Sequence, residues 1–350
     1  MPKINKKFKS VYLRKSPGGS PLGEINSGES IETSERQGAW TRVKVDAWVR
    51  TDLIEPDPAP LPPPQAHTWH HPKYLLGVSC LNDHAAGMEA LAKGCRSVLF
   101  MDGLIAAIQA AKAYPDAVIF SRSWFQHAPD PVWLADHHGA GLMDVPDNLW
   151  STCANECDWI CYGTPEELKR RFEYEKSFVG ALWAKNPRRK VVIGEFSHGT
   201  PDTENPAIVK MFKETYYDFA ARYPDRIRLG WHLYTKGRRF TSHPQEIDGA
   251  PKGPEWYEGR DARFWTLCGS NTKVRHMCGE TGVESSGGGV VHAGYSDQQF
   301  KEWCNWWLEY RRNQPVPMDA ACLFQYGNHP NWRGYDVRKY AGVLEEFWKS

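Results

Sequence analysis

The sequence from Tyr74 onward repeats one pattern, a short apolar run followed by a longer segment with helical periodicity. This alternation is typical of a parallel α/β fold, because each parallel strand needs a helical crossover before the next. We expect strands at Leu75–Cys80, Ser97–Met101, Ala117–Ser121, Leu149–Ala154, Val191–Gly194, Ile227–His232, Val274–Cys278 and Ala321–Gln325. Eight such units predict a closed (β/α)₈ TIM barrel.

Helical segments are expected between these strands, and some carry clear start signals. Thr164-Pro-Glu-Glu combines a capping residue, a proline at the first helical position and acidic residues in the first turn. The other expected helices are Ala85–Ala92, Leu104–Ala113, a segment near Pro131–His138, Pro206–Arg222, Glu255–Leu267, Asp297–Arg312 and Val337–Trp348.

Residues 1–55 have a different character, with short alternating runs broken by Gly and Pro and no helical period. They predict a small all-β barrel. Leu13-Arg14, Gly38-Ala-Trp40 and Ala47-Trp48-Val49 resemble the bacterial Src-homology-3-like domains. The resemblance implies binding to a cell-wall or other extracellular polymer, and packing against the barrel is the alternative. Residues 56–72 form a Pro-rich linker expected to be extended, and residues 73–350 form the TIM barrel.

Composition excludes several functions. The formal charge of +1 and the absence of a clustered basic surface argue against a nucleic-acid partner. No run of about 18 apolar residues predicts a membrane span, and the N-terminus lacks the apolar core of a signal peptide. The nine Cys match no zinc or cluster spacing, and several lie within apolar strands, so we expect neither a metal nor another cofactor.

The loops that follow the strands build the site of such a barrel at one face. Polar and aromatic residues are concentrated at these strand ends. They are Asn82, Asp102, Arg122, Trp124, Asn155, Glu156, Glu195, His198, His232, Tyr234, Glu280, Gln325 and Tyr326. Glu156 and Glu280 follow the fourth and seventh strands, and a pair of carboxyl groups facing one cavity is what glycosidic bond cleavage requires.

This arrangement resembles glycoside hydrolase clan A, whose (β/α)₈ retaining glycosidases carry Asn-Glu after strand four and Glu after strand seven. Asn155-Glu156 and Glu280 match both positions, and His232-Leu-Tyr234 matches the strand-six His/Tyr. Trp124 and Trp332 are placed as sugar platforms. The sequence departs from the clan at the end of strand two, where Asp102 stands in place of the usual Arg.

The resemblance implies a retaining mechanism without a cofactor. Glu156 would be the acid/base and Glu280 the nucleophile, with Tyr234 or His232 donating a hydrogen bond to it and Asn155 holding the sugar 2-hydroxyl. Further substrate contacts are expected from Arg122, Trp124, Glu195, His198, Gln325, Tyr326 and Trp332. Two alternatives remain for the acids: Glu156 and Glu280 could be salt-bridged structural carboxylates, and Glu195 could be a rival nucleophile.

The expected function is therefore hydrolysis of a β-linked polysaccharide or a cell-wall glycan such as peptidoglycan. The alternative is a non-catalytic glycan-binding protein that uses the same barrel. The N-terminal module also suggests a wall-degrading enzyme of a phage particle or a cell wall. Sugar identity, oligomeric state and localisation do not follow from the sequence.

Overall fold

The computed structural model describes residues 71–124, 129–153, 155, 163–197, 199–235, 257–284 and 288–350, and the strands of an N-terminal unit. The chain divides into two compact units, residues 1–67 and 68–350. The N-terminal strands are β1 Lys3–Ile4, β2 Ser10–Arg14, β3 Pro21–Asn26, β4 Thr33–Gln37, β5 Trp40–Val43, β6 Ala47–Arg50 and β7 Ile54–Glu55. They pair antiparallel. Their side chains and the Pro-rich linker lie outside the described residues, so the Src-homology-3-like assignment stays a prediction.

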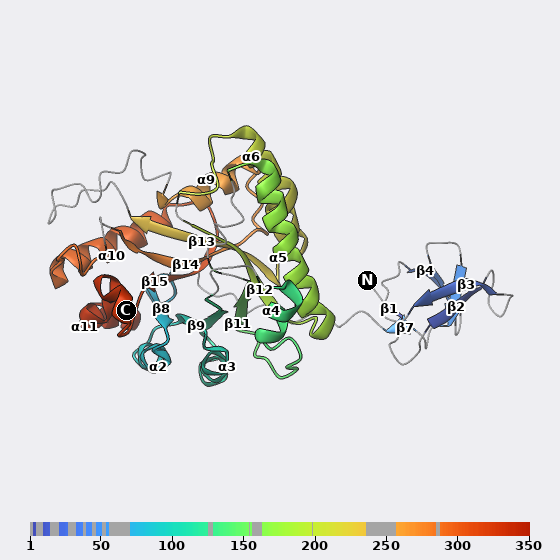
Figure 1. Cartoon of the computed structure of the whole chain (residues 1–350), viewed down its shortest axis with the longest axis horizontal. Helices are drawn as coiled ribbons and strands as arrows, with labels where there is room; N and C mark the ends of the chain where they lie inside the picture. The colour runs from blue at the N-terminus through green and yellow to red at the C-terminus, as the bar shows by residue number, and fades with distance from the viewer. Residues whose placement is uncertain are drawn as a thin grey trace. The chain divides into compact units, whose positions relative to one another are not determined.

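The second unit is a closed barrel of eight parallel strands (Figure 1). The strands are β8 Gly77–Leu81, β9 Ser97–Met101, β10 Val118–Arg122, β11 Leu149–Thr152, β12 Lys190–Phe196, β13 Ile227–Thr235, β14 His276–Val283 and β15 Met318–Phe324. Each strand pairs with the next along the chain, and β15 pairs with β8 to close the ring. The predicted TIM barrel is confirmed.

Helices alternate with the strands and surround the ring (Figure 1). They are α1 Pro72–Leu75, α2 His84–Ala92, α3 Leu104–Ala113, α4 Pro131–His137, α5 Pro165–Lys185, α6 Pro206–Phe212, α7 Asp218–Arg222, α9 Arg260–Leu267, α10 Asp297–Arg312 and α11 Ala341–Lys349. A π-helical turn, η3 Lys213–Tyr217, joins α6 to α7, and the 3-10 turns η4 Pro330–Tyr335 and η5 Val337–Tyr340 precede α11.

The first strand was predicted too early. Leu75, which was expected to begin it, is the last residue of the short helix α1, where His71 caps the helix and Pro72 occupies a first-turn position. The strand begins instead at Gly77, where a Cβ would lie 1.8 Å from Ser97 Oγ. Strands β12, β13 and β14 extend further than expected, and the extra residues carry the acids of the candidate site.

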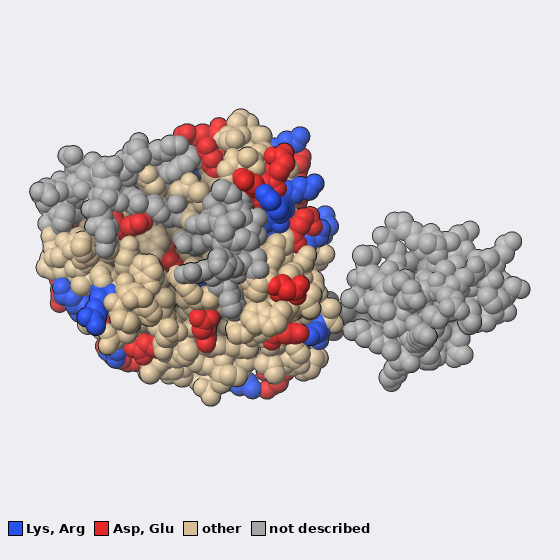
Figure 2. Space-filling view, in the orientation of Figure 1, with Lys and Arg blue, Asp and Glu red and all other residues tan. Residues whose placement is uncertain are grey.

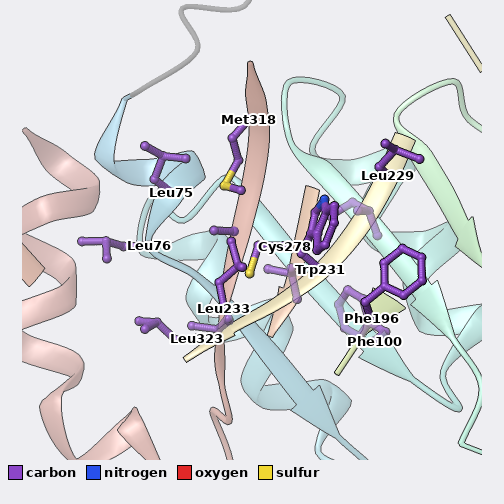
Figure 3. Close-up of a cluster of buried hydrophobic side chains, with 14 of the residues drawn as sticks. Leu75, Leu76, Phe100, Phe196, Leu229, Trp231, Leu233, Cys278, Met318 and Leu323 are labelled. Carbon is purple, nitrogen blue, oxygen red and sulfur yellow. The ribbon is translucent and has the colours of Figure 1, made fainter. Parts of the chain in front are cut away.

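Alternation along the strands produces two hydrophobic layers. Leu99 and Met101 of β9 face the barrel interior, whereas Val98 and Phe100 face the helices. In the outer layer Trp231 of β13 packs 5.2 Å from Phe196 of β12, measured between ring centroids (Figure 3). Because side chains fill both layers, the inside of the barrel is a packed core. The surface that a ligand can reach therefore lies at the ends of the barrel.

The two ends of the barrel sequence meet on one side of the ring. Trp348 of α11 donates its indole N–H to the Leu76 carbonyl at 2.7 Å, and Trp307 of α10 donates to the Leu75 carbonyl at 3.3 Å. Both indoles are buried. The last helix therefore covers the seam between β15 and β8.

The described helices lack the combination of length and apolarity that crossing a membrane requires. On the face seen in Figure 2, acidic and basic side chains are both present, and several of opposite charge lie next to each other. The seven cysteines within the described ranges are buried, as expected for those in apolar strands.

One buried histidine makes the stability of the barrel depend on pH. Burial and the Arg189 guanidinium lower the pKa of His138 to about 3. The folded protein therefore keeps the ring neutral, whereas the unfolded chain protonates it near its usual pKa of about 6.5. The contribution of His138 to the free energy of unfolding is therefore complete above about pH 6.5. It is lost as the pH falls toward 3, by up to about 1.4 kcal/mol per pH unit.

We predict that the wild type loses about 2 kcal/mol more unfolding free energy than His138→Gln between pH 7 and pH 5. The amide of the variant does not titrate, so this difference isolates the imidazole. Urea denaturation followed by tryptophan fluorescence at both pH values measures it. Parallel losses in the two proteins would contradict the prediction.

Candidate active site

The arginine at the end of β10 connects the two acids of the barrel mouth. Arg122 Nη2 donates to Glu280 Oε1, and Arg122 Nη1 donates to Glu195 Oε2 at 3.2 Å. The arginine is fully buried, and the side chains of Glu195 and Glu280 are 1% and 7% exposed. Charge-assisted hydrogen bonds of this kind are roughly twice as strong as neutral ones, so Arg122 fixes both carboxylates.

Strand β13 supplies two further contacts to the same acids. Tyr234 donates its hydroxyl proton to Glu280 Oε2 at 2.8 Å. His232 lies between the carboxylates, with Nε2 2.9 Å from Glu195 Oε2 and Nδ1 3.5 Å from Glu280 Oε2. Glu280 is thus buried at the barrel mouth and oriented by an arginine and a tyrosine.

Two β-bulges aim these acids. In the pairing of β12 with β13, Gly194 and Glu195 together oppose one residue, Gly230. In the pairing of β13 with β14, Gly279 is the extra residue before Glu280. A bulge shifts the alternation of side chains and re-aims the residue that follows. The same dipeptide, Gly-Glu, therefore performs the same task on strands five and seven.

Glycine is required around the Glu195 carboxylate. A Cβ on Gly279 would lie 2.2 Å from Glu195 Oε2, and a Cβ on Gly230 would lie 2.6 Å from Oε1. Both distances are far below van der Waals contact. Glu195 therefore lies in a slot that only a backbone without side chains can form.

Several strand ends have strained backbone. Asn82, Asp102 and Glu195 have φ values of +56°, +52° and +42°. They account for three of the four non-glycine residues with positive φ in the described part of the chain. Such strain costs on the order of 1–3 kcal/mol per residue and concentrates at functional sites. The mouth of the barrel is therefore the region where function is best sought.

A cavity of about 300 Å³ opens above β8, β9 and β10. Its walls carry the indoles of Trp124 and Trp332 and the polar groups of Asn82, Asp102, His329 and Asn331. Trp332 contacts Tyr335 at 5.7 Å, and Tyr335 contacts Tyr234 at 6.3 Å, measured between ring centroids. A row of aromatic rings therefore connects the cavity with the tyrosine that binds Glu280.

The remaining predicted site residues take different places. Gln325 is buried and donates to the Gly327 and Trp332 carbonyls at 3.2 and 3.4 Å, so it supports the loop that carries Trp332. Tyr326 is 0% exposed and packs against Trp348 in the outer layer, so its ring points away from the mouth. Asn155 is partly exposed. Glu156 and His198 lie outside the described residues, and their roles stay predictions.

Sequence reasoning missed two parts of this arrangement. Arg122 was expected to contact substrate, and the structure places its guanidinium against the Glu195 and Glu280 carboxylates, a pairing that the sequence did not indicate. The bulges were also missed, although a glycine inside a predicted strand, directly before an acid, is a known sign of one. Glu195, considered as a rival nucleophile, accepts hydrogen bonds beneath Glu280 and is 1% exposed.

The geometry limits the chemistry that Glu280 can perform. Its two oxygens accept hydrogen bonds from Arg122 and Tyr234, groups that stabilise the ionised carboxylate. A carboxylate oriented in this way is suited to act as a nucleophile or to stabilise a cation. Among the described residues, no three His, Cys, Asp or Glu side chains converge to hold a metal ion.

Comparisons with known proteins agree with the barrel. No protein family and no curated protein matches the sequence. Similar solved structures include a GH5-4 broad specificity endoglucanase from Clostridium acetobutylicum, with a TM-score of 0.52 and 8% identity over 79% of this chain and 96% of that chain. The structure of ZgEngAGH5_4 in complex with a cellotriose has a TM-score of 0.53 and 10% identity over 79% of this chain and 98% of that chain. A monomeric β-xylosidase from Caulobacter crescentus has a TM-score of 0.52 and 12% identity over 79% of this chain and 68% of that chain. At sequence identities this low, the structural similarity shows a shared fold alone.

Gly279→Ala is expected to destabilise the barrel by about 1–3 kcal/mol, because its new Cβ would overlap Glu195 Oε2. Gly180→Ala is the matched control. Gly180 lies on the exposed face of α5, where a Cβ meets nothing within 4 Å, and the change should stabilise the helix by roughly 0.5–1 kcal/mol. Urea denaturation of both variants measures the difference. Gly279→Ala as stable as wild type would show that the slot is not tight.

Proposed function

We propose that this chain is a retaining glycoside hydrolase that cleaves β-linked polysaccharides, with Glu280 as nucleophile and Glu156 as acid/base. The observation that carries the proposal is the Glu280 carboxylate, oriented at the barrel mouth by Arg122 and Tyr234. A merely structural ion pair with Arg122 needs no tyrosine hydroxyl on the second carboxylate oxygen.

In the first step a Glu280 oxygen attacks the anomeric carbon while Glu156 transfers its proton to the leaving glycosidic oxygen, which breaks the glycosidic bond. The sugar is then covalently attached to Glu280. In the second step Glu156 accepts a proton from water, and the water oxygen displaces Glu280 with net retention of configuration. The bond from Tyr234 keeps the attacking oxygen oriented in both steps.

The cavity lined by Trp124 and Trp332 supports a polysaccharide substrate. Indole faces stack on the apolar faces of sugar rings, and the amide and carboxylate groups at the rim can bind hydroxyls. The structural neighbours include endoglucanases and a β-xylosidase, and one contains a cellotriose. These proteins act on or bind β-linked glycans, which is the class we propose here.

A non-catalytic glycan-binding protein is the second candidate, because the tryptophan-lined cavity alone would serve binding. The two candidates differ in what Glu280 does. In a binding protein, loss of its charge would alter affinity only. In a hydrolase, it removes turnover and leaves binding intact.

Glu280→Gln is expected to lower kcat on a responsive β-glycan by at least about 10⁴-fold, because an amide is not nucleophilic. Glu156→Gln should lower kcat by about 10²–10⁴-fold, as for loss of a general acid. Tyr234→Phe removes one hydrogen bond to a charged group and should cost about 10–100-fold. A panel of cellulose, xyloglucan, xylan and peptidoglycan, assayed by release of reducing ends, measures these effects.

The anomeric form of the first product, followed by proton NMR, checks the stereochemistry. Retention supports the double displacement, and inversion would contradict it. Glycan binding without cleavage by wild type and all three variants would favour the binding protein.

Trp332→Ala is expected to raise KM, or weaken oligosaccharide binding, by about tenfold, because it removes one stacking face of the cavity. Trp133→Ala is the matched control. Trp133 is 50% exposed on α4 and does not line that cavity, so its loss should leave KM unchanged. Isothermal calorimetry with cellotriose or a xylan oligomer checks both. An equal effect of the two substitutions would exclude the cavity as the sugar site.

A further inference from the structure

Helix α5 carries an ion pair on its buried face, at an unusual place. Arg171 and Glu175 are 0% and 1% exposed, and they follow the same stripe as Leu168, Phe172 and Phe178. Arg171 Nε lies 3.5 Å from Glu175 Oε1. Burying an ion costs several kcal/mol in lost hydration, and apolar residues would fill the space between α5 and β12 without that cost.

The pair binds both backbone groups of one residue. Arg171 Nη2 donates to the Gly194 carbonyl oxygen, and the Gly194 N–H donates to Glu175 Oε2 at 3.0 Å. The bulge of β12 interrupts the regular ladder with β13 at this point. Buried backbone groups need partners, and only a donor next to an acceptor can satisfy the N–H and the carbonyl of one residue.

Gly194 is also the residue that sets the direction of Glu195. Its φ of +100° is followed by +42° at Glu195, so the chain makes two left-handed steps between Ile193 and Phe196. This conformation turns the Glu195 side chain into the slot beside Gly230 and Gly279. There its Oε2 meets Arg122 and His232.

We infer that Arg171 and Glu175 are positioning residues for the reaction. They hold the Gly194 peptide, the peptide places Glu195, and Glu195 fixes Arg122 and His232 beneath Glu280. The inference rests on the proposed function, because Glu280 is the group whose chemistry this chain of contacts serves. Glu175 and Arg171 themselves touch no substrate.

The first test replaces the pair with apolar residues of similar size, Arg171→Met with Glu175→Leu. We expect kcat to fall about 100-fold with KM within about twofold, because misplacement of the reacting group by about 1 Å has effects of that order. Glu175→Gln keeps an acceptor for the Gly194 N–H and the shape of the side chain. It should fold if the double variant does not, and lose about tenfold in kcat.

The matched control is Arg311→Met with Asp261→Leu. This pair joins α9 to α10 through bonds of 2.6 and 3.0 Å and is equally buried, but neither side chain contacts Gly194 or the mouth acids. Its loss should lower stability and leave kcat within about twofold. Equal losses of kcat in control and test variants would show a general stability effect and overturn the inference.

Crystal structures of Glu175→Gln and of the double variant give a readout that needs no activity. In the double variant we expect Glu195 Oε2 to move out of hydrogen-bond distance of Arg122 Nη1, and in Glu175→Gln, which keeps an acceptor for the Gly194 N–H, we expect a smaller displacement. An unchanged Arg122–Glu195 contact in both variants would overturn the inference. If the wild type cleaves no glycan, the proposed function fails, and the position of Glu195 still decides the role of the pair.

Discussion

Arg122 is the charge on which the barrel mouth depends. Two carboxylates, Glu195 and Glu280, contact one guanidinium that has no exposure to water. Without that cation, two buried like charges would face each other, and removing one partner of a buried pair costs about 3–5 kcal/mol. The bulges, the glycine slot and the bond from Tyr234 are all arranged around this central ion.

Much of the barrel could be predicted from the sequence. The limits of β9, α3 and α10 match the predicted segments, because each has a clear apolar period and a clear boundary. Strand β14 was predicted to end at Cys278, yet it continues to Val283. In the sequence pattern Gly279 suggests the end of the strand. In the structure Gly279 forms a β-bulge, and β14 continues beyond it.

The candidate site was predicted in part. His232, Tyr234 and Glu280, which were expected at strand ends, come together at the mouth. The role of Arg122 could not be predicted, because which of several strand-end groups a long side chain reaches depends on tertiary geometry. The same holds for Arg171 and Glu175, although two charged residues on an otherwise apolar helical stripe were a visible signal. The partner acid Glu156 remains a prediction from sequence.

The seam between β15 and β8 has a consequence for how the chain reaches its native state. The ring closes through contacts between Leu323 and Val78 and through the Trp348–Leu76 hydrogen bond, which join opposite ends of the barrel sequence. Such high contact order slows folding. During synthesis the early strands leave the ribosome first, so β8 must wait with an unpaired edge until β15 and the last helix arrive.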